Sequence, residues 1–272
     1  MSLNSSSNAA RALDILLTLG EADADGLPLG EIAIRVGEAK PAVHRSLASL
    51  MQKGFAELAG RRGHYRLGPA ITMLARRQAR LEPLIARYRP GMTEFVRRNG
   101  YTVYMMVQAG VDAVCAEMVS RFPQQQLRLG LGGRVPMGVA AGSVALLSML
   151  PADHYKQLIE ANAERYITHP SVQHVDATVV LEQVREAQRR GYATNMGYYH
   201  PGDGGIGVPI LSRSPHEMNV AISCTLPLEM MTDAFISNLV KELKDCLFTS
   251  QRMQDRASGQ QPLSLPVEKG LG

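Results

Sequence analysis

The chain has 272 residues and a mass of 29.6 kDa, and 45% of its residues are hydrophobic and 20% charged. This composition excludes a disordered chain and predicts one large globular domain or two ordinary ones. No stretch approaches the ~18 apolar residues of a membrane helix, and Met1–Asn8 lacks a basic and then apolar leader, so a cytoplasmic protein without a membrane partner is expected. The three widely spaced cysteines, Cys115, Cys224 and Cys246, favour a reducing compartment.

Positive charge is concentrated in the first part of the chain. Residues 1–98 carry 15 Lys and Arg against 9 Asp and Glu, a net charge of +6, whereas residues 99–272 carry 14 against 16, a net charge of −2. This asymmetry predicts that the first part meets a polyanion while the second part has another task. A solvated basic face would explain the charge equally well.

Three helices are expected in the first part. Asn8 caps a helix that continues to Leu19, Leu29–Val36 forms a second that ends at Gly37, and Pro41–Lys53 forms a third with its proline in the first turn. The apolar residues at helical spacing in the first helix are Ala9, Ala12, Leu13, Leu16 and Leu17.

The second and third helices have the spacing of a helix-turn-helix. Ala33 permits a close helix crossing, Gly37 permits the tight turn, and Val43 packs the second helix against the first. Phe55–Leu67 then reads as a β-hairpin with Gly60–Gly63 at its tip. The combination predicts a winged helix-turn-helix that binds double-stranded DNA.

The third helix and the wing supply the expected DNA contacts. Arg45 can present two parallel donors to guanine, so it is the first choice for base reading, while Lys40 and the arginines of the wing suit phosphates. His44 suits either role or none. The predicted DNA-binding residues are Lys40, His44, Arg45, Ser46, Arg61, Arg62 and Arg66.

These residues resemble the isocitrate lyase regulator (IclR) family of bacterial transcription factors, and the resemblance spans about residues 8–253. The matching residues are Arg11–Leu16, Glu31–Ala33, Lys40, Val43–Arg45, Leu47, Leu50, Gly54, Phe55, Tyr65–Gly68, Arg134–Met137, Gly191–Ala193, Ile206–Ile210 and Ala221–Ser223. Pro41 and Ala42 stand where this family usually has a Ser or Thr pair, so two hydroxyls that could contact DNA are missing and the operator sequence does not transfer.

The residues after the wing predict a helical linker and then an α+β domain. Two helices are expected within Ile71–Arg98, meeting near Leu81–Pro83. Their arginines either follow DNA or are simply solvated, and their apolar side chains are expected to pack against a second copy. Those apolar residues are Ile71, Met73, Leu74, Leu81, Leu84 and Ile85.

Strands and helices alternate in the second part. Strands are predicted at residues 101–108, 113–119, 127–131, 192–195, 205–211 and 218–225, and helices at 139–150, 152–163, 176–190 and 228–253. The resemblance implies a GAF-like α/β sandwich that binds an effector. The expected domains are 1–70 for the winged helix-turn-helix, 71–98 for the linker, 99–255 for the effector domain and 256–272 for a mobile tail.

An effector pocket is expected between the sheet and the segments that cross it. A helix starting at Ala140–Ser143 offers amide donors, Asn195 precedes a glycine-rich loop, and Ser223 and Thr225 share one face of a strand. The resemblance implies the same positions together with Gly205. The predicted effector-binding residues are Ala140, Ala141, Gly142, Ser143, Asn195, Gly205, Ser223 and Thr225.

The ligand is predicted from the amide at position 195, where the family has an acidic residue. Asn195 can donate a hydrogen bond to a carboxylate that an aspartate would repel, which favours an organic acid, aromatic acids included. Five methionines suit either adaptable pocket walls or plain core. They are Met105, Met106, Met118, Met137 and Met196.

Other chemistries lack a supporting pattern. His169 and His174 have no carboxylate or cysteine at ligand spacing, Cys224 is expected to be a buried thiol, and Gly130–Gly133 is not followed by a phosphate-binding Gly-Lys-Ser. No catalytic site, metal or cofactor is therefore predicted.

The predicted function is a ligand-responsive regulator of transcription that acts as a homodimer or a dimer of dimers on paired half-sites. The alternative is a small-molecule-binding or catalytic sheet domain whose basic first segment mediates association with another protein.

Overall fold

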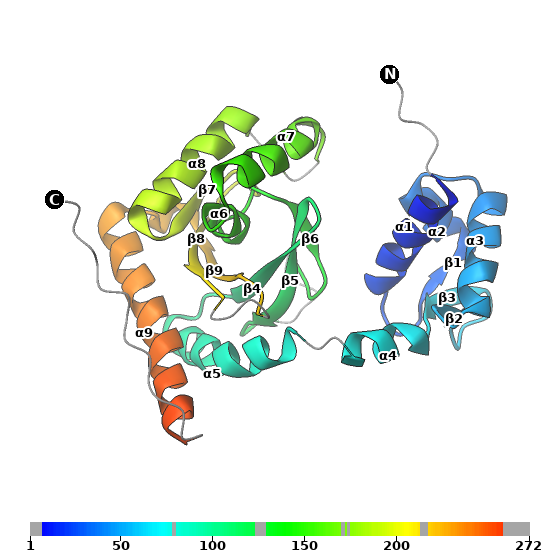
Figure 1. Cartoon of the computed structure of the whole chain (residues 1–272), viewed down its shortest axis with the longest axis horizontal. Coiled ribbons are helices and arrows are strands. Elements are labelled where there is room, and N and C mark those ends of the chain that lie inside the picture. The colour runs from blue at the N-terminus through cyan, green and yellow to red at the C-terminus, as the bar shows by residue number, and fades with distance from the viewer. Residues whose placement is uncertain are drawn as a thin grey trace. The chain divides into compact units, whose positions relative to one another are not determined.

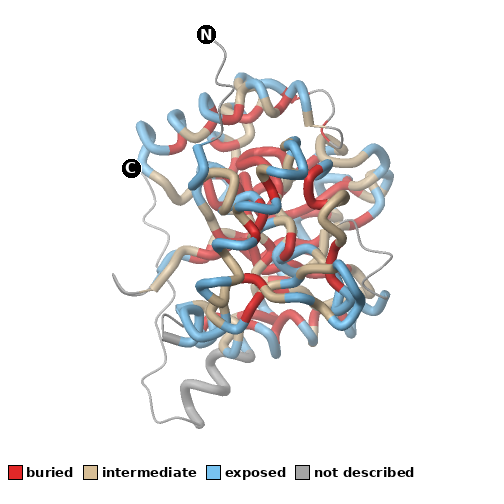
Figure 2. Tube along the Cα trace, turned by 90° about the vertical axis from the view of Figure 1, so that its right-hand side faces the viewer, coloured by how far each residue is buried: buried red, intermediate tan, exposed pale blue. Residues whose placement is uncertain are grey.

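The computed structural model of the chain describes residues 7–77, 80–122, 129–169, 172, 175–212 and 217–257. The chain divides into two compact units, Met1–Ala79 and Arg80–Gly272 (Figure 1). Buried residues follow the strands and the inward sides of the helices (Figure 2). None of the described helices is long and apolar enough to cross a membrane.

The first unit is a helix-turn-helix with a small antiparallel sheet. Its helices are α1 (Asn8–Gly20), α2 (Leu29–Val36), α3 (Lys40–Gln52) and α4 (Pro69–Arg77), and its strands are β1 (Leu27–Pro28), β2 (Ala56–Leu58) and β3 (His64–Leu67). The strand order is β1-β3-β2. The predicted helices and wing are confirmed, and the sheet contains one strand, β1, that was not predicted.

Local sequence signals set the ends of these helices. Gly37 ends α2 with a φ of 72°, as predicted, because glycine adopts the left-handed conformation without steric cost. The expected cap of α1 is one residue off. Ser7 is the N-cap, and its hydroxyl accepts from the Ala10 amide at 3.1 Å, while the Asn8 carboxamide accepts from Arg11.

The buried side of α1 differs from the apolar positions emphasised in the sequence. Ile15 and Leu19 are buried together with Ile32 and Val43, whereas Leu13 is 61% exposed. The helix carries apolar residues on more than half of its circumference, so spacing alone does not say which side faces the core. The packing of α1 on α2 and α3 makes that choice.

The second unit contains a six-stranded antiparallel sheet with the order β6-β5-β4-β9-β8-β7. Its strands are β4 (Val103–Ala109), β5 (Asp112–Val119), β6 (Arg134–Pro136), β7 (Ala193–Met196), β8 (Asp203–Ile210) and β9 (Val220–Pro227). Its helices are α5 (Glu82–Asn99), α6 (Ala141–Ser148), α7 (Ala152–Thr168), α8 (Ala177–Arg190) and α9 (Asp233–Ala257), with a short 3₁₀ helix η2 (Leu228–Met230).

The two faces of this sheet are covered by different helices. Ile222, Cys224 and Leu226 of β9 belong to the core that also includes residues of α5 and α9. Ala221 belongs to the core on the other face, which α6, α7 and α8 cover. Figure 1 shows these helices on the two sides of the sheet. The predicted α+β architecture is confirmed.

One predicted strand is wrong. Residues 127 and 128 of the expected strand 127–131 lie outside the described residues, and residues 129–131 form bends and turns. The strand beside β5 is β6 instead, and it starts at Arg134, between the expected strand 127–131 and the expected helix 139–150, where no element was predicted. The predicted helix 228–253 is also divided, because η2 and residues 231–232 precede α9.

The two helices expected between the units are present, but they do not form one element. Helix α4 belongs to the first unit, whereas α5 packs on α9 and β5 in the second. Pro83 lies in the first turn of α5, and Pro90 lies inside the helix. Leu84 is only 3% exposed within its own chain's core, so its predicted packing against a second copy is wrong.

Candidate functional site

One side of α3 carries polar residues to the surface. Lys40, His44 and Arg45 are exposed, and Ser46 is partly buried. On the other side of the helix, Val43 is fully buried and Leu47 nearly so, which holds α3 on the core. This leaves the exposed side of α3 available to enter a DNA groove.

The wing places two of the predicted arginines at the surface. Arg61 and Arg62 are exposed in the turn between β2 and β3, and the Arg61 carbonyl accepts from the His64 amide at 3.1 Å. Gly63 closes this turn with a φ of 76°. Two exposed guanidinium groups at a hairpin tip suit contact with phosphates.

Arg66 has a different environment from Arg61 and Arg62. It lies directly across from Glu57 in the β2–β3 pair, and its Nε and one terminal nitrogen lie 2.8 and 2.7 Å from Glu57 Oε1. The carboxylate therefore offsets the charge of Arg66. A phosphate would meet a weaker field here than at the wing tip.

Sequence reasoning missed part of the α3 surface. A groove of about 550 Å³ between α1 and α3 is lined by Arg45 and also by Ser49 and Lys53, which are both exposed. Ser49 follows Arg45 by four residues, so helical spacing could have placed it on the same side. The polar surface of α3 therefore extends to its C-terminal end.

The arginines of α5 are paired with carboxylates of their own unit. Arg87 donates to Glu217 at 3.0 Å, and Arg89 donates through its Nε to the buried Glu117 at 3.0 Å. Arg97 and Arg98 both donate to Glu94, and these hydrogen bonds lower the pKa of Glu94 to about 2. Their charge is largely compensated within the unit.

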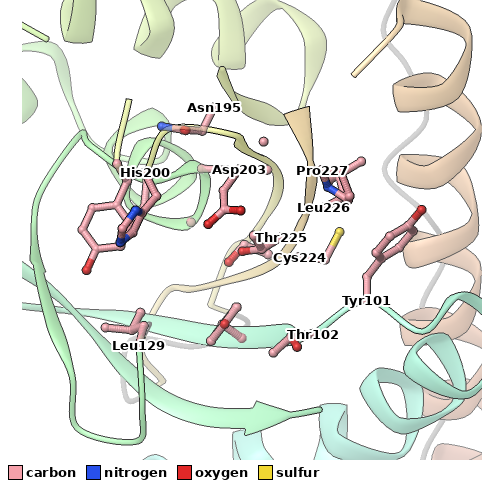
Figure 3. A pocket seen from close by; sticks show the side chains of 18 of the residues that line it. Tyr101, Thr102, Leu129, Asn195, His200, Asp203, Cys224, Thr225, Leu226 and Pro227 are labelled. Atoms are coloured by element: carbon pink, nitrogen blue, oxygen red, sulfur yellow. The ribbon is translucent and has the colours of Figure 1, made fainter. Parts of the chain in front are cut away.

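The main cavity of the second unit lies beside the N-terminus of α6 and has a volume of about 460 Å³ (Figure 3). Seven of the eight predicted effector-binding residues line it. They are Ala140, Ala141, Gly142, Asn195, Gly205, Ser223 and Thr225. The segments that supply them lie far apart in the sequence, so the fold creates this cluster.

Strand register explains why these residues meet. Ser223 pairs with Gly207 of β8 and with Tyr104 of β4, and Thr225 pairs with Gly205. Paired residues, and residues two apart on a strand, point to the same face of a sheet. Both hydroxyls therefore lie on the face that α6 covers.

Glycines bring α6 close to the sheet. A Cβ at Gly207 would lie 2.4 Å from the carbonyl oxygen of Ala141, and a Cβ at Gly142 would lie 2.8 Å from the Ser223 hydroxyl. A Cβ at Gly205 would lie 3.3 Å from that of Ala141. The first turn of α6 thus packs directly on the backbone of β8, which brings its amides next to the pocket.

Ser143 does not line the pocket. Its hydroxyl is completely buried, accepts from the amides of Gly138 and Ala140 at 3.0 Å each, and donates to the Ala140 carbonyl. These bonds shape the start of α6. Ser143 therefore acts on the pocket through the position of Ala140.

Asn195 also makes bonds within the protein. Its Nδ2 donates to the Val139 carbonyl at 2.6 Å, and its Oδ1 accepts from the amides of Gly197 and Tyr198, both at 3.2 Å. It thereby joins β7, the segment before α6 and the loop that follows β7. Its Nδ2 carries a second hydrogen that these bonds do not use, and Asn195 lines the cavity.

Several polar residues of the pocket were not predicted. Tyr104, Asp203 and His200 line it, and Asp203 lies beside Thr225 in Figure 3. A hydrogen bond joins Tyr104 and Thr225, and burial is the main cause that raises the pKa of Tyr104 to about 12. Asp203 precedes Gly205 by two residues, so strand alternation could have identified it once β8 was extended to its start.

The cysteines and most of the methionines lie in the core. Burial raises the pKa of the Cys224 thiol to about 12, and its side chain belongs to the α5–α9 core, as expected. Among the five methionines considered, Met106 lines the pocket, whereas Met105 faces the opposite core and Met137 is fully buried.

Within the described part of the chain, no group of three His, Cys, Asp or Glu side chains could hold a metal ion. His169 packs against Tyr199, with 6.3 Å between ring centroids, and burial lowers its pKa. His174 lies outside the described residues.

Solved structures share this fold. A regulator from Alicyclobacillus acidocaldarius matches with a TM-score of 0.67 and 20% identity over 90% of this chain and 97% of that one. An IclR homologue from Microbacterium hydrocarbonoxydans, complexed with 4-hydroxybenzoate, matches with a TM-score of 0.67 and 22% identity over 91% of this chain and all of that one.

Sequence comparisons agree with the fold. The transcriptional repressor IclR of Escherichia coli is 24% identical over 225 residues, 82% of this chain and 81% of the relative. The regulator Rv1719 of Mycobacterium tuberculosis is 36% identical over 146 residues, 53% of this chain and 54% of the relative. The family model of the IclR helix-turn-helix domain matches residues 9–59, and that of the bacterial transcriptional regulator IclR C-terminal domain matches residues 79–249. The chain therefore belongs to the IclR family of DNA-binding transcriptional regulators.

Proposed function

We propose that this regulator reads its operator through α3 and the wing, and that a small organic acid bound beside α6 changes its affinity for that operator. The observation that supports the effector site best is the convergence of seven separately predicted residues on one cavity. The exposed Arg45, Arg61 and Arg62 support the DNA-binding role.

The chemistry of the pocket favours an acid. The first amides of a helix have no intrahelical acceptors, and Ala140, the N-cap of α6, provides no side-chain hydrogen bond to them. Ala140, Ala141 and Gly142 line the cavity, which therefore lies at the positive end of the helix dipole. The Ser223 hydroxyl lies next to these donors. The relative that contains 4-hydroxybenzoate supports including aromatic acids in the proposal.

We assign the pocket to binding rather than to catalysis. The pKa values of Tyr101, Tyr104 and Cys224 are all raised, with burial as the largest cause. A nucleophile or base is activated by the opposite kind of environment. The effector then acts by binding one arrangement of the protein more tightly than another.

We propose a homodimer or a dimer of dimers in the cytoplasm, where the chromosome lies. Exposed apolar side chains on two helices of the first unit support self-association. They are Leu13 and Leu17 on α1 and Met73 and Leu74 on α4. Two copies would place two wings on half-sites about one helical turn, or a multiple of it, apart. Sedimentation equilibrium of the full chain tests this, and a monomer at micromolar concentration contradicts it.

The function is tested with the full-length protein and DNA from upstream of its own and neighbouring genes. Fluorescence anisotropy measures affinity with and without 4-hydroxybenzoate, with neutral 4-hydroxybenzyl alcohol as the matched control ligand. We expect binding to at least one upstream fragment over coding DNA, and a change in affinity with an acid only. Failure to bind any upstream fragment at low salt contradicts the DNA-binding role, and equal effects of the acid and the alcohol contradict the acid site.

A further inference from the structure

The pocket beside α6 contains a carboxylate as well as amide donors. Asp203 lies on β8 two residues before Gly205, and both residues are on the face that α6 covers. The inference drawn from this carboxylate rests on the proposed effector function and concerns the second functional group of the effector.

Register places the donors and the carboxylate at different points along β8 and β9. The amide of Gly142 and the hydroxyl of Ser223 lie at the Gly207–Ser223 pair, Thr225 lies at the next pair on that face, and Asp203 lies one pair further, opposite Pro227. Residues two apart on a strand are about 7 Å apart, so Asp203 lies about 14 Å along β8 from the donor pair. A single ring with a polar group at each end, together with the hydrogen bond that each group makes, covers a similar distance.

The donor end has an unused polar group. Ser223 is only 7% exposed and lines the cavity, and the hydrogen bonds of the described residues include none made by its hydroxyl. The hydroxyl can therefore form a hydrogen bond with a ligand oxygen at this point. The neighbouring amides of α6 would bind the same oxygen or its carboxylate partner.

The acidic end opposes a simple anion. Asp203 is the one carboxylate among the described lining residues, which include neither lysine nor arginine. Tyr104, Tyr199 and His200 line the same region. A plain carboxylic acid bound at α6 would have no favourable contact with Asp203, and the two negative charges would repel each other across the pocket.

We propose that the effector carries a hydrogen-bond donor, either a hydroxyl or an ammonium group, at the end opposite its carboxylate, and that Asp203 accepts this hydrogen bond. Asp203 is then the residue that selects donor-bearing acids from plain acids. Thr225, between the two ends, contacts the middle of the ligand.

Calorimetry of the full-length protein tests the selection with three acids of similar shape. Benzoate lacks a donor, 4-hydroxybenzoate carries a hydroxyl, and 4-(aminomethyl)benzoate carries an ammonium group. We expect at least one donor-bearing acid to bind about tenfold more tightly than benzoate, because a hydrogen bond to a charged group is a strong one. The acid that binds more tightly than benzoate shows whether the donor is a hydroxyl or an ammonium group.

Asp203→Asn is compared with Glu229→Gln, which removes an exposed carboxylate on η2 that does not line the pocket. We expect Asp203→Asn to reduce the preference to less than threefold and to bind benzoate more tightly than the unaltered protein. Glu229→Gln should retain the preference. Tighter benzoate binding also shows that the variant is folded, because a damaged pocket would lose it.

The outcomes separate this inference from the proposed function. Equal affinity of the unaltered protein for all three acids overturns the role of Asp203 and leaves the acid site in place, and so does a preference that survives in Asp203→Asn. If none of the acids binds while upstream DNA does, the acid site and this inference both fail.

Discussion

The DNA-reading surface and the effector pocket bring their residues together in different ways. The predicted DNA contacts all come from residues 40–66, and most of them are exposed on α3 or at the wing tip. The pocket residues come from helices α5 and α6, from strands β4, β7, β8 and β9 and from the loops between them, and several are buried. Side chains of the first kind can change without disturbing the core, whereas those of the second kind also help to hold the fold.

The largest expected effect is on folding, from a methyl group at the contact between α6 and β8. In Gly207→Ala the new Cβ would meet the Ala141 carbonyl, so either α6 or β8 must move. We expect a loss of about 3 kcal/mol and a fall in Tm of about 6–12 °C by calorimetry. Gly130→Ala is the matched control because a Cβ there meets open space. An unchanged Tm for Gly207→Ala would show that a substitution in the pocket is tolerated as well as one on the DNA-reading surface.

Removing the wing charges should affect binding and not folding. Arg61→Ala combined with Arg62→Ala removes two phosphate contacts per protomer, so affinity should fall about a hundredfold. The slope of log affinity against log salt should decrease by about 2 per protomer, with Tm unchanged. Arg66→Ala should have a smaller effect because Glu57 already offsets that charge. A salt slope unaffected by the double variant would exclude phosphate contacts at the wing tip.

Arg45→Ala separates base reading by α3 from phosphate binding by the wing, both within the first unit. If Arg45 contacts a guanine, its loss should cost about 1–3 kcal/mol on the preferred operator and little on unrelated DNA. Competition between the two DNAs measures this difference. Gln52→Ala, at an exposed position of α3 that does not line the groove beside Arg45, is the control for a general effect on the helix. Arg45 is not a base-reading residue if preference for the operator is retained.

Asn195→Ala should produce the smallest effect of the series, and it should act on ligand binding and stability together. The variant loses the bonds to Val139, Gly197 and Tyr198, so we expect about 1–2 kcal/mol of lost stability and weaker effector binding. DNA affinity without effector should stay within about twofold. Reduced effector binding with an unaltered Tm would mean that Asn195 serves the ligand alone.

Local signals made the first unit predictable from the sequence. Helix α2 begins and ends where Leu29, Val36 and Gly37 predicted, because one glycine and one apolar stripe determine it. The second unit depends on pairing between distant strands. Ser223 and Thr225 could be predicted because they are two residues apart on one strand. Tyr104 and Asp203 lie near them only because β4 and β8 are the neighbours of β9 in the sheet.

The errors have the same physical origin. Strand β6 has three residues and pairs with β5 across a connection of more than a dozen residues, so nothing in its own sequence distinguishes it from a loop. Leu84 was expected to face another copy because its apolar stripe looked unpartnered in a linker. Its partner is the core shared with α9, which lies far along the chain.

Helix α5 is the first helix of the second unit, and it anchors the chain that comes from the DNA-binding unit to the core of the second unit. Leu84, in its first turn, is part of the hydrophobic core. Five residues later, Arg89 is bonded to Glu117 of β5, a strand of the sheet that forms the pocket floor. Helix α5 is therefore held rigidly on the sheet within the second unit. If a ligand shifts the sheet, α5 should move with it, and an insertion or deletion at Arg80–Leu81, just before α5, tests whether the response depends on this connection.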